Sequence, residues 1–263
     1  MPLRVPRRGA GGLQAGRRDG VRRADRPERL RRRHRRPRRS AGAEVADVLA
    51  AHVEGGKGRF RGIRQISVWD ASPEIPLARP NPPGLLGDPA FREGFVALGE
   101  AGLSFDAWLY HPQIPELTDL ARAHPDVQII CDHLGGPLRI GPYAQDREEV
   151  LQAWRSALED LATCPNVALK LGGIGMPSMG EDWHQHPYQT TSEEIAEKWD
   201  PQLRWCIETF GVDRCLFESN FPVDRQSFGY VEAWNAFKRV TADASRADKE
   251  ALFHNTALKV YRI

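Results

Sequence analysis

The sequence lacks the features of a membrane, secreted or disulfide-stabilised protein. None of its apolar runs approaches the roughly 18–20 residues that a membrane-spanning helix needs. Arginine interrupts its start too often for the uncharged stretch of roughly 7–15 residues that a secretory signal requires. Its four cysteines show neither the paired spacing of a zinc knuckle nor the density of a disulfide scaffold. These absences exclude an integral membrane protein, give no reason to expect a membrane partner, and predict a cytoplasmic location.

Aromatic residues and lysine are absent from the first 40 residues. All 22 aromatic residues lie at Phe60 or later, and residues 1–40 hold 16 arginines against three acidic residues, a net charge of +13. A segment of this composition cannot bury enough apolar surface to fold, so we expect 1–40 to be disordered. The rest of the chain holds 21 basic and 32 acidic residues, which predicts an acidic folded domain over 41–263.

The arginine-rich segment has three interpretations. It can be a basic arm that binds nucleic-acid phosphates by counterion release. It can be a transit-like leader, although its three acidic residues and its lack of an apolar face argue against this. It can also be translated from a non-native frame, since GC-rich coding DNA read out of frame yields mostly Arg, Pro, Gly and Ala. The composition favours the third interpretation, which places the start of the intact gene further upstream and argues against nucleic acid as a partner.

From residue 60 onward, short β-branched or aromatic runs alternate with helical periodicity. This alternation predicts βα units and a parallel sheet. The expected strands lie at 60–66, 103–110, 127–133, 166–173 and 214–220. The residues before 60 hold too little strand pattern for three more strands. We therefore expect an α/β fold, a (β/α)8 TIM-type barrel that is incomplete at its N-terminus because its first strands are missing or scrambled.

Polar residues follow each predicted strand at its carboxyl end. They are Arg64 and Gln65, Tyr110 and His111, Asp132 and His133, Lys170, and Glu218, Ser219 and Asn220. Active sites of (β/α)8 barrels gather at the C-terminal ends of the strands, where the loops vary while the barrel holds the geometry. The positions of these residues predict an active site at that end of the sheet.

Five segments resemble the amidohydrolase superfamily. They are GRFRGIRQ, VQIICDHLGGP, NVALKLGGIGMP, FGVDRCLFESNFPVD and the closing NTALKVYRI. The sequence is most similar to the amidohydrolase-2-like branch, which contains sugar-lactone and 2-pyrone-4,6-dicarboxylate lactonases, and the likeness covers 41–263. Lactone, amide and decarboxylation chemistries share this scaffold, so the resemblance indicates the family more than the substrate.

The resemblance also implies which histidines act. In this family the first strand normally carries a His-x-His pair, and further histidines end strands in the middle of the barrel. His133 matches such a position and His111 is a second candidate, so these two would be the metal ligands if any residue is. The His-x-His pair has no counterpart, because His34 lies in the arginine run and His52 on a predicted helix. We expect weak binding of a divalent metal or none in this chain, and Zn or Mn in an intact homologue.

Asn220 stands where the family's Ser-Asp-x-Pro motif has its aspartate. A neutral amide cannot take a proton from water, so the general base must come from elsewhere. The neighbouring candidates are Asp224, Glu218, Asp132 and His133. The position of Asp224, four residues past the strand end, favours that residue.

Four residues are candidates for substrate binding. Arg64 can grip a carboxylate in a bidentate manner that lysine cannot match. Lys170 can polarise a carbonyl group or pair with Asp132. Trp69 and Asp70 follow the Arg64 strand, and we expect them to line the pocket.

A second His-x-His pair, His184 and His186, lies in a polar insertion without a strand pattern. Two imidazoles meet a metal only where the backbone holds them, so we do not expect ligation here. We interpret the insertion as a lid over the pocket, with Met176, Trp183 and Tyr188 as its apolar contacts.

Together these features predict a hydrolase that opens a lactone or similar cyclic ester of a small carboxylated metabolite. Arg64 and Lys170 would orient the anion, His111 and His133 would polarise the carbonyl group, and Asp224 would activate water. A metal-dependent decarboxylase or amide hydrolase on the same barrel is the alternative enzyme. An inactive truncated barrel and a protein that binds nucleic acid through its basic arm are alternatives of another class. The expected partners are a small-molecule substrate and further copies of the chain in a homo-oligomer.

Overall fold

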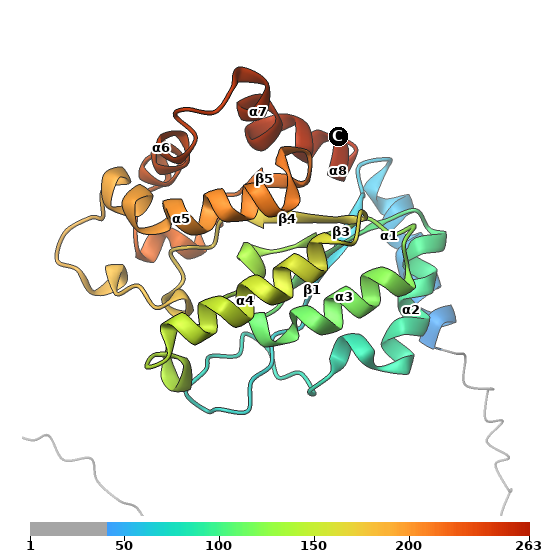
Figure 1. The fold of residues 1–263 in the computed structure, drawn as a ribbon. Helices are drawn as coiled ribbons and strands as arrows, with labels where there is room; N and C mark the ends of the chain where they lie inside the picture. The colour runs from blue at the N-terminus through green and yellow to red at the C-terminus, as the bar shows by residue number, and fades with distance from the viewer. Residues whose placement is uncertain (1–40) are drawn as a thin grey trace, which may run out of the picture. The chain divides into compact units, whose positions relative to one another are not determined.

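A computed structural model describes residues 41–263. Its centre is a sheet of five parallel strands in the order β1-β2-β3-β4-β5 (Figure 1). The strands are β1 (Gly62–Ile66), β2 (Ser104–Trp108), β3 (Ile129–Cys131), β4 (Val167–Leu171) and β5 (Cys215–Phe217). The α/β class and the parallel sheet predicted from the sequence are confirmed, whereas closure into a barrel and incompleteness at the N-terminus stay predictions. The interpretations of the arginine-rich segment fall on 1–40, outside the described residues.

Four of the strands, β2 to β5, are shorter at their carboxyl ends than the sequence predicts, and β1 ends where predicted. The run predicted at 127–133 forms a strand only over Ile129–Cys131, and a 3-10 turn follows at His133–Gly135. A second 3-10 turn, His111–Gln113, follows β2. Because the chain leaves the sheet this early, most of the polar residues predicted at the strand ends lie just beyond the strands, whereas Arg64 and Lys170 lie within β1 and β4.

Eight α-helices accompany the strands in the described part of the chain. They are α1 (Ala41–Gly56), α2 (Pro89–Glu100), α3 (Ile114–Ala123), α4 (Arg147–Ala162), α5 (Ser192–Phe210), α6 (Tyr230–Val240), α7 (Arg246–Glu250) and α8 (Thr256–Tyr261). Figure 1 shows α3, α4 and α5 side by side across one face of the sheet. Within 41–263, no helix combines the length and the apolar character that crossing a bilayer demands.

Helix starts follow the local sequence. Asp88 precedes α2 and accepts a hydrogen bond from the Phe91 backbone N–H at 2.9 Å, while Pro89 occupies the first helical position. Helix α5 begins with a capping box, in which Thr191 and Glu194 each bind the other's backbone N–H. These caps fix where the chain enters the two helices.

The two faces of the sheet differ in chemistry, because successive residues of a strand point to opposite sides. The face under the helices is apolar, and its fully buried members include Phe105, Ile129, Leu169 and Cys215. The opposite face, called the inner face here, carries the register partners Arg64 and Asp106 on β1 and β2, and Lys170 on β4. One face therefore supplies the core and the other supplies charged groups.

Helix α8 packs against the inner face. Its residue Val260 forms a small apolar cluster with Ile130, Ala168 and Leu216 of β3, β4 and β5. The backbones of Arg61 and Arg262 also lie next to each other, because each of these arginine side chains donates to the other's carbonyl oxygen. The end of the chain therefore reaches from β5 to the start of β1.

Candidate active site

A sharp turn after β3 places His133 at the centre of the inner face. His133, Leu134, Gly135 and Gly136 all have positive φ, between 55° and 67°. At Gly136 a Cβ atom would overlap the carbonyl oxygen of Leu109, so the turn requires glycine there. The indole of Trp154 donates to Leu134 O at 2.6 Å and holds the turn from the helical side. Backbone strain of this kind often marks a functional residue, here a histidine.

His133 lies between a carboxylate and a guanidinium. Its Nδ1 atom forms a short contact with Glu218 Oε1, and its Nε2 atom lies 2.8 Å from Arg64 Nη2. A guanidinium can only donate, so Nε2 accepts from Arg64 and Nδ1–H donates to Glu218. This pairing fixes one neutral tautomer of His133, with the lone pair on Nε2.

A second group of charges lies beside His133 on the inner face. Asp132 is fully buried, and its two oxygens lie 2.8 Å from Arg64 Nε and 2.8 Å from Lys170 Nζ. Lys170 Nζ also lies 2.6 Å from Asp106 Oδ1 and 3.8 Å from Glu218 Oε2. These five residues form a connected cluster with two cations and three carboxylates, and we call them, with His133, the inner-face cluster.

The charges of this cluster stabilise one another. Burial disfavours the charged form of Lys170, but the three carboxylates around it outweigh burial and raise its pKa above the ordinary value. Burial alone would raise the pKa of Glu218, but His133, Lys170 and Arg64 lower it below the ordinary value. Glu218 therefore stays ionised beside His133, and Lys170 stays a cation.

Asp224 and Asn220 lie on the turn after β5. Asn220 Nδ2 donates to Asp224 Oδ1 at 2.6 Å, and the Gly175 backbone N–H donates to Oδ2 at 3.0 Å. Burial raises the pKa of Asp224 to about 7, even though both hydrogen bonds lower it. Asp224 thus ties the loops after β4 and β5 together, and its carboxyl group titrates near neutral pH.

His111 lies at the end of β2 in a different polar environment from His133. Its Nδ1 atom accepts from the Leu138 backbone N–H at 3.2 Å, and its ring packs edge-on against Tyr143. Burial lowers the pKa of His111 to about 4, and the Asp70 carboxylate opposes this only in part. His111 is therefore neutral at pH 7, and its one N–H proton lies on Nε2.

Trp69 and Asp70 lie on the loop after β1, beside His111 and Tyr143. Asp70 accepts from the Tyr143 hydroxyl at 2.7 Å, and the Trp69 backbone N–H donates to the Gln113 side chain at 3.0 Å. The structure therefore groups Asp70 with His111, and it groups Arg64, His133 and Lys170 in the inner-face cluster.

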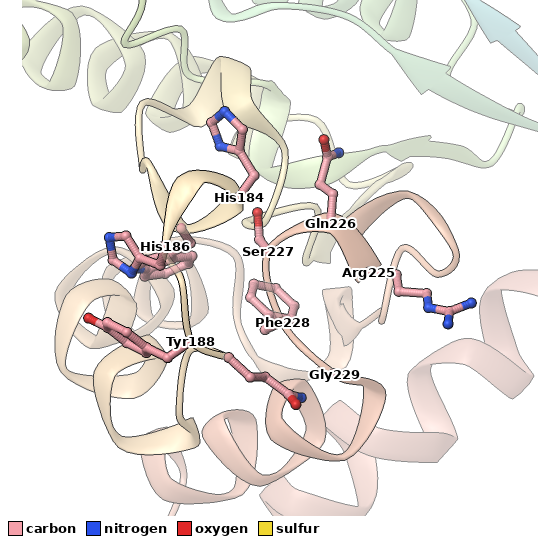
Figure 2. A pocket seen from close by; sticks show the side chains of 10 residues that line it. His184, His186, Tyr188, Arg225, Gln226, Ser227, Phe228 and Gly229 are labelled. Carbon is pink, nitrogen blue, oxygen red and sulfur yellow. The ribbon is translucent and has the colours of Figure 1, made fainter.

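The insertion that contains His184 and His186 lines a cavity of about 300 Å³ with the turn at 225–229. Figure 2 shows His184, His186 and Tyr188 on one side of this cavity and Phe228 on the other. His186 Nε2 lies 3.1 Å from Asp182 Oδ1 in the same turn. Trp183 is buried and packs edge-on against Phe228, so the insertion is a packed segment.

The described residues do not form a metal site. No group of three or more His, Cys, Asp or Glu side chains is arranged around a common point in the described range. Both ring nitrogens of His133 face protein partners, and one of these partners, Arg64, is a cation. Residues 41–263 by themselves therefore do not fit the three protein ligands of a typical catalytic zinc site.

Two residues of the site were not predicted from the sequence. Asp106 lies in the middle of β2, and Tyr261 lies on α8, where its hydroxyl reaches Asp106. The alternation of LSFDAWLY places Asp106 on the face opposite Phe105, which is a usable signal for a buried charge. Tyr261 had no such signal, because its contact depends on how α8 crosses the sheet.

The chain matches a known protein family. The family model described as Amidohydrolase matches residues 8–263.

Individual proteins are also similar to the chain. The uncharacterized protein y4mH of Sinorhizobium fredii is 38% identical over 220 residues, which are 84% of this chain and 66% of that protein. An L-fucono-1,5-lactonase of Burkholderia ambifaria is 30% identical over 185 residues, which are 68% of this chain and 56% of the lactonase. The chain thus spans less than two thirds of the length of these two relatives.

Solved structures share the fold. A crystal structure of an amidohydrolase from Burkholderia multivorans with bound zinc has a TM-score of 0.66 at 24% identity, and the match covers 83% of this chain and 70% of that one. At this identity the likeness concerns the arrangement of strands and helices.

Proposed function

Since the chain belongs to the amidohydrolase family, we propose that it is a hydrolase that opens a lactone or similar cyclic ester of a small carboxylated metabolite. The observation that carries the proposal is the position of His133, whose imidazole is held in one tautomer between Glu218 and Arg64 at the strand ends. Sequence similarity to L-fucono-1,5-lactonases supports a cyclic ester as the substrate.

In this proposal His133 is the general base. Its Nε2 atom takes a proton from water while the water oxygen bonds to the carbonyl carbon of the lactone. The bond between this carbon and the ring oxygen then breaks, and the ring oxygen takes the proton back from Nε2. Glu218 stabilises the imidazolium that forms in between, because it is ionised and accepts from Nδ1–H.

His111 is the proposed donor to the oxygen of the reacting carbonyl group. With Nδ1 bound to the Leu138 backbone N–H, its proton lies on Nε2, and its low pKa of about 4 keeps it neutral at pH 7. A fixed donor of this kind stabilises a developing oxyanion by roughly 3–4 kcal/mol. This role follows from the tautomer and from the strand-end position.

Arg64 and Lys170 take different parts in the proposal. The Arg64 side chain is 47% exposed, so a carboxylate of the substrate can reach its guanidinium. Lys170 is engaged by Asp106 and Asp132, so we assign it mainly to holding the carboxylates in place. Trp69 and Asp70 remain proposed as pocket-lining residues near His111.

Asp224 is the second candidate for the base. Its pKa of about 7 suits proton transfer at neutral pH, but both of its oxygens already accept hydrogen bonds from Asn220 and Gly175. We therefore propose that Asp224 holds Asn220 and the loop after β4 around the substrate, and that His133 moves the proton.

A substrate panel tests the proposal. The chain is incubated with aldonolactones and pyrone dicarboxylates, and ring opening is followed by proton release, with His133→Ala as the variant and exposed His254→Ala as the matched control. We expect turnover that His254→Ala retains and His133→Ala loses. Equal rates in His133→Ala and the unmodified chain would contradict the proposal, and release of carbon dioxide in place of ring opening would favour the decarboxylase.

A further inference from the structure

The lone pair on His133 Nε2, which the proposed function needs as the base, already accepts a hydrogen bond from Arg64. Arg64 Nη2 donates to His133 Nε2 at 2.8 Å, and Nε2 is the only unprotonated nitrogen of that ring. A water molecule cannot give its proton to a nitrogen that already accepts from a guanidinium. The contact between Arg64 and His133 must therefore open before His133 acts as a base.

The imidazole itself is held in place. Its side chain is 3% exposed, and Nδ1 is tied to Glu218. A Cβ atom at Gly173 would lie 2.7 Å from His133 Cβ, which shows how closely the neighbouring loop packs against the ring. Trp108 covers a further side, with ring centroids 5.9 Å apart. The contact therefore opens by movement of Arg64.

Arg64 is the more exposed of the two partners. It lies on β1, a strand with one neighbouring strand among residues 41–263, and about half of its side chain faces solvent. Movement of Arg64 would weaken its ion pair with Asp132 and its contact with the ring of Trp108, whose centroid is 5.8 Å from the guanidinium carbon. Lys170 also binds Asp132, at 2.8 Å, so the buried carboxylate keeps a cation when Arg64 turns.

From these contacts we infer that a carboxylate of the substrate releases His133 by drawing Arg64 away from Nε2. A carboxylate accepts two parallel hydrogen bonds from the end of a guanidinium, which are stronger than one bond to a neutral imidazole. The inference rests on the proposed function and narrows its substrate class to cyclic esters with a carboxylate within reach of Arg64. The substrate carboxylate then acts on the rate of the chemical step as well as on binding.

The test compares two lactones that differ at one group, a ring carboxylate and the corresponding carboxamide. With the unmodified chain we expect kcat to be at least tenfold lower for the carboxamide. Arg64→Met removes the donor while keeping an unbranched side chain, so the carboxamide should gain at least tenfold in kcat and the carboxylate should lose its advantage. Arg122→Met is the matched control, since Arg122 is 52% exposed and pairs with Asp160 on the surface.

Added anion gives a second readout, which can be taken on the unmodified chain. Acetate at high concentration should raise kcat for the carboxamide in the unmodified chain and in Arg122→Met, but not in Arg64→Met. This arm keeps the inference testable if Arg64→Met does not fold, which thermal unfolding would reveal.

The outcomes separate the two claims. Equal kcat values for the two lactones in the unmodified chain, with no effect of acetate, would overturn the inference and leave the proposed function standing. Absence of turnover for both lactones would overturn the proposed function and the inference with it.

Discussion

The hydroxyl of Tyr261 lies 2.5 Å from Asp106 Oδ1, although 155 residues separate the two in the sequence. The same oxygen accepts from Lys170 Nζ at 2.6 Å, and Lys170 also lies over the ring of Tyr261, 5.6 Å from its centroid. Helix α8 therefore contributes a side chain that contacts two members of the inner-face cluster. The end of the chain is part of the structure that holds the charges of the candidate active site.

Replacing Lys170 by methionine should destabilise the fold strongly. The variant leaves Asp106, Asp132 and Glu218 with one cation fewer in a buried cluster, and loss of one partner from such a cluster costs about 3–5 kcal/mol. Urea unfolding at pH 7 measures the free energy of unfolding. Lys198→Met is the control, because Lys198 is half exposed and its ion pair with Glu181 should contribute less than about 1 kcal/mol. Similar losses in the two variants would show that the cluster does not depend on Lys170.

Replacing Glu218 by glutamine should reduce catalysis with little change in shape. The amide keeps the volume of the side chain but no longer stabilises an imidazolium at His133, so we expect kcat to fall about 100-fold or more. Steady-state kinetics on the best lactone of the panel measures the effect. Glu208→Gln, an exposed position on α5, should keep the full rate. A Glu218→Gln variant as active as Glu208→Gln would remove His133 from the role of base.

Stability should decline in acid because of His111. Its pKa is lowered from 6.5 to about 4 in the folded chain, so below pH 6.5 the unfolded chain binds a proton that the folded chain does not. The contribution of His111 to the free energy of unfolding is therefore complete above pH 6.5 and is lost as the pH falls toward 4, by about 3 kcal/mol. His111→Asn retains an acceptor for the Leu138 N–H and should flatten this decline in chemical unfolding between pH 7 and 4, whereas exposed His254→Asn should not. A decline of unchanged slope in His111→Asn would contradict the burial of a neutral imidazole.

Asp224 should act on stability with the opposite sign. Its pKa is raised from 3.8 to about 7, so between these values the folded chain holds a proton that the unfolded chain has lost. Its contribution to the free energy of unfolding therefore decreases as the pH rises from about 4 to 7, by on the order of 4 kcal/mol.

The variant Asp224→Asn removes this titration. The free energy of unfolding of Asp224→Asn minus that of the unmodified chain should rise steadily from pH 4 to pH 7. The altered hydrogen bond to Asn220 adds a loss of stability that does not change with pH. Asp213→Asn, at an exposed position, is the matched control and should give a difference that is flat with pH. A flat difference for Asp224→Asn as well would show that this carboxyl group is not buried as the fold places it.

Local sequence patterns predicted the sheet well because they report local physics. The run around Phe105 alternates, the run around Ile129 is a short continuous apolar stretch, and both form the expected parallel strands. The strand ends were predicted too far along the chain. Hydrophobic periodicity does not reveal the turn at His133, where positive φ begins directly after Asp132.

The candidate site could be predicted only in part. His111 and His133 give the same sequence signal, a histidine just after a strand, yet one ring binds the backbone of Leu138 and the other binds two charged side chains. Contacts with residues of other strands and loops decide this difference. Such contacts join residues far apart in the chain, so no local pattern contains them.

The most direct test of the account is hydrolysis in water enriched in oxygen-18, with the opened product weighed by mass spectrometry. Attack of water on the lactone carbonyl predicts one labelled oxygen in the new carboxylate of each product molecule, at a rate that His133→Gln lowers about 100-fold or more. Ring opening without label, or labelling by His133→Gln at the unmodified rate, would contradict the central claim that His133 activates water against a cyclic ester.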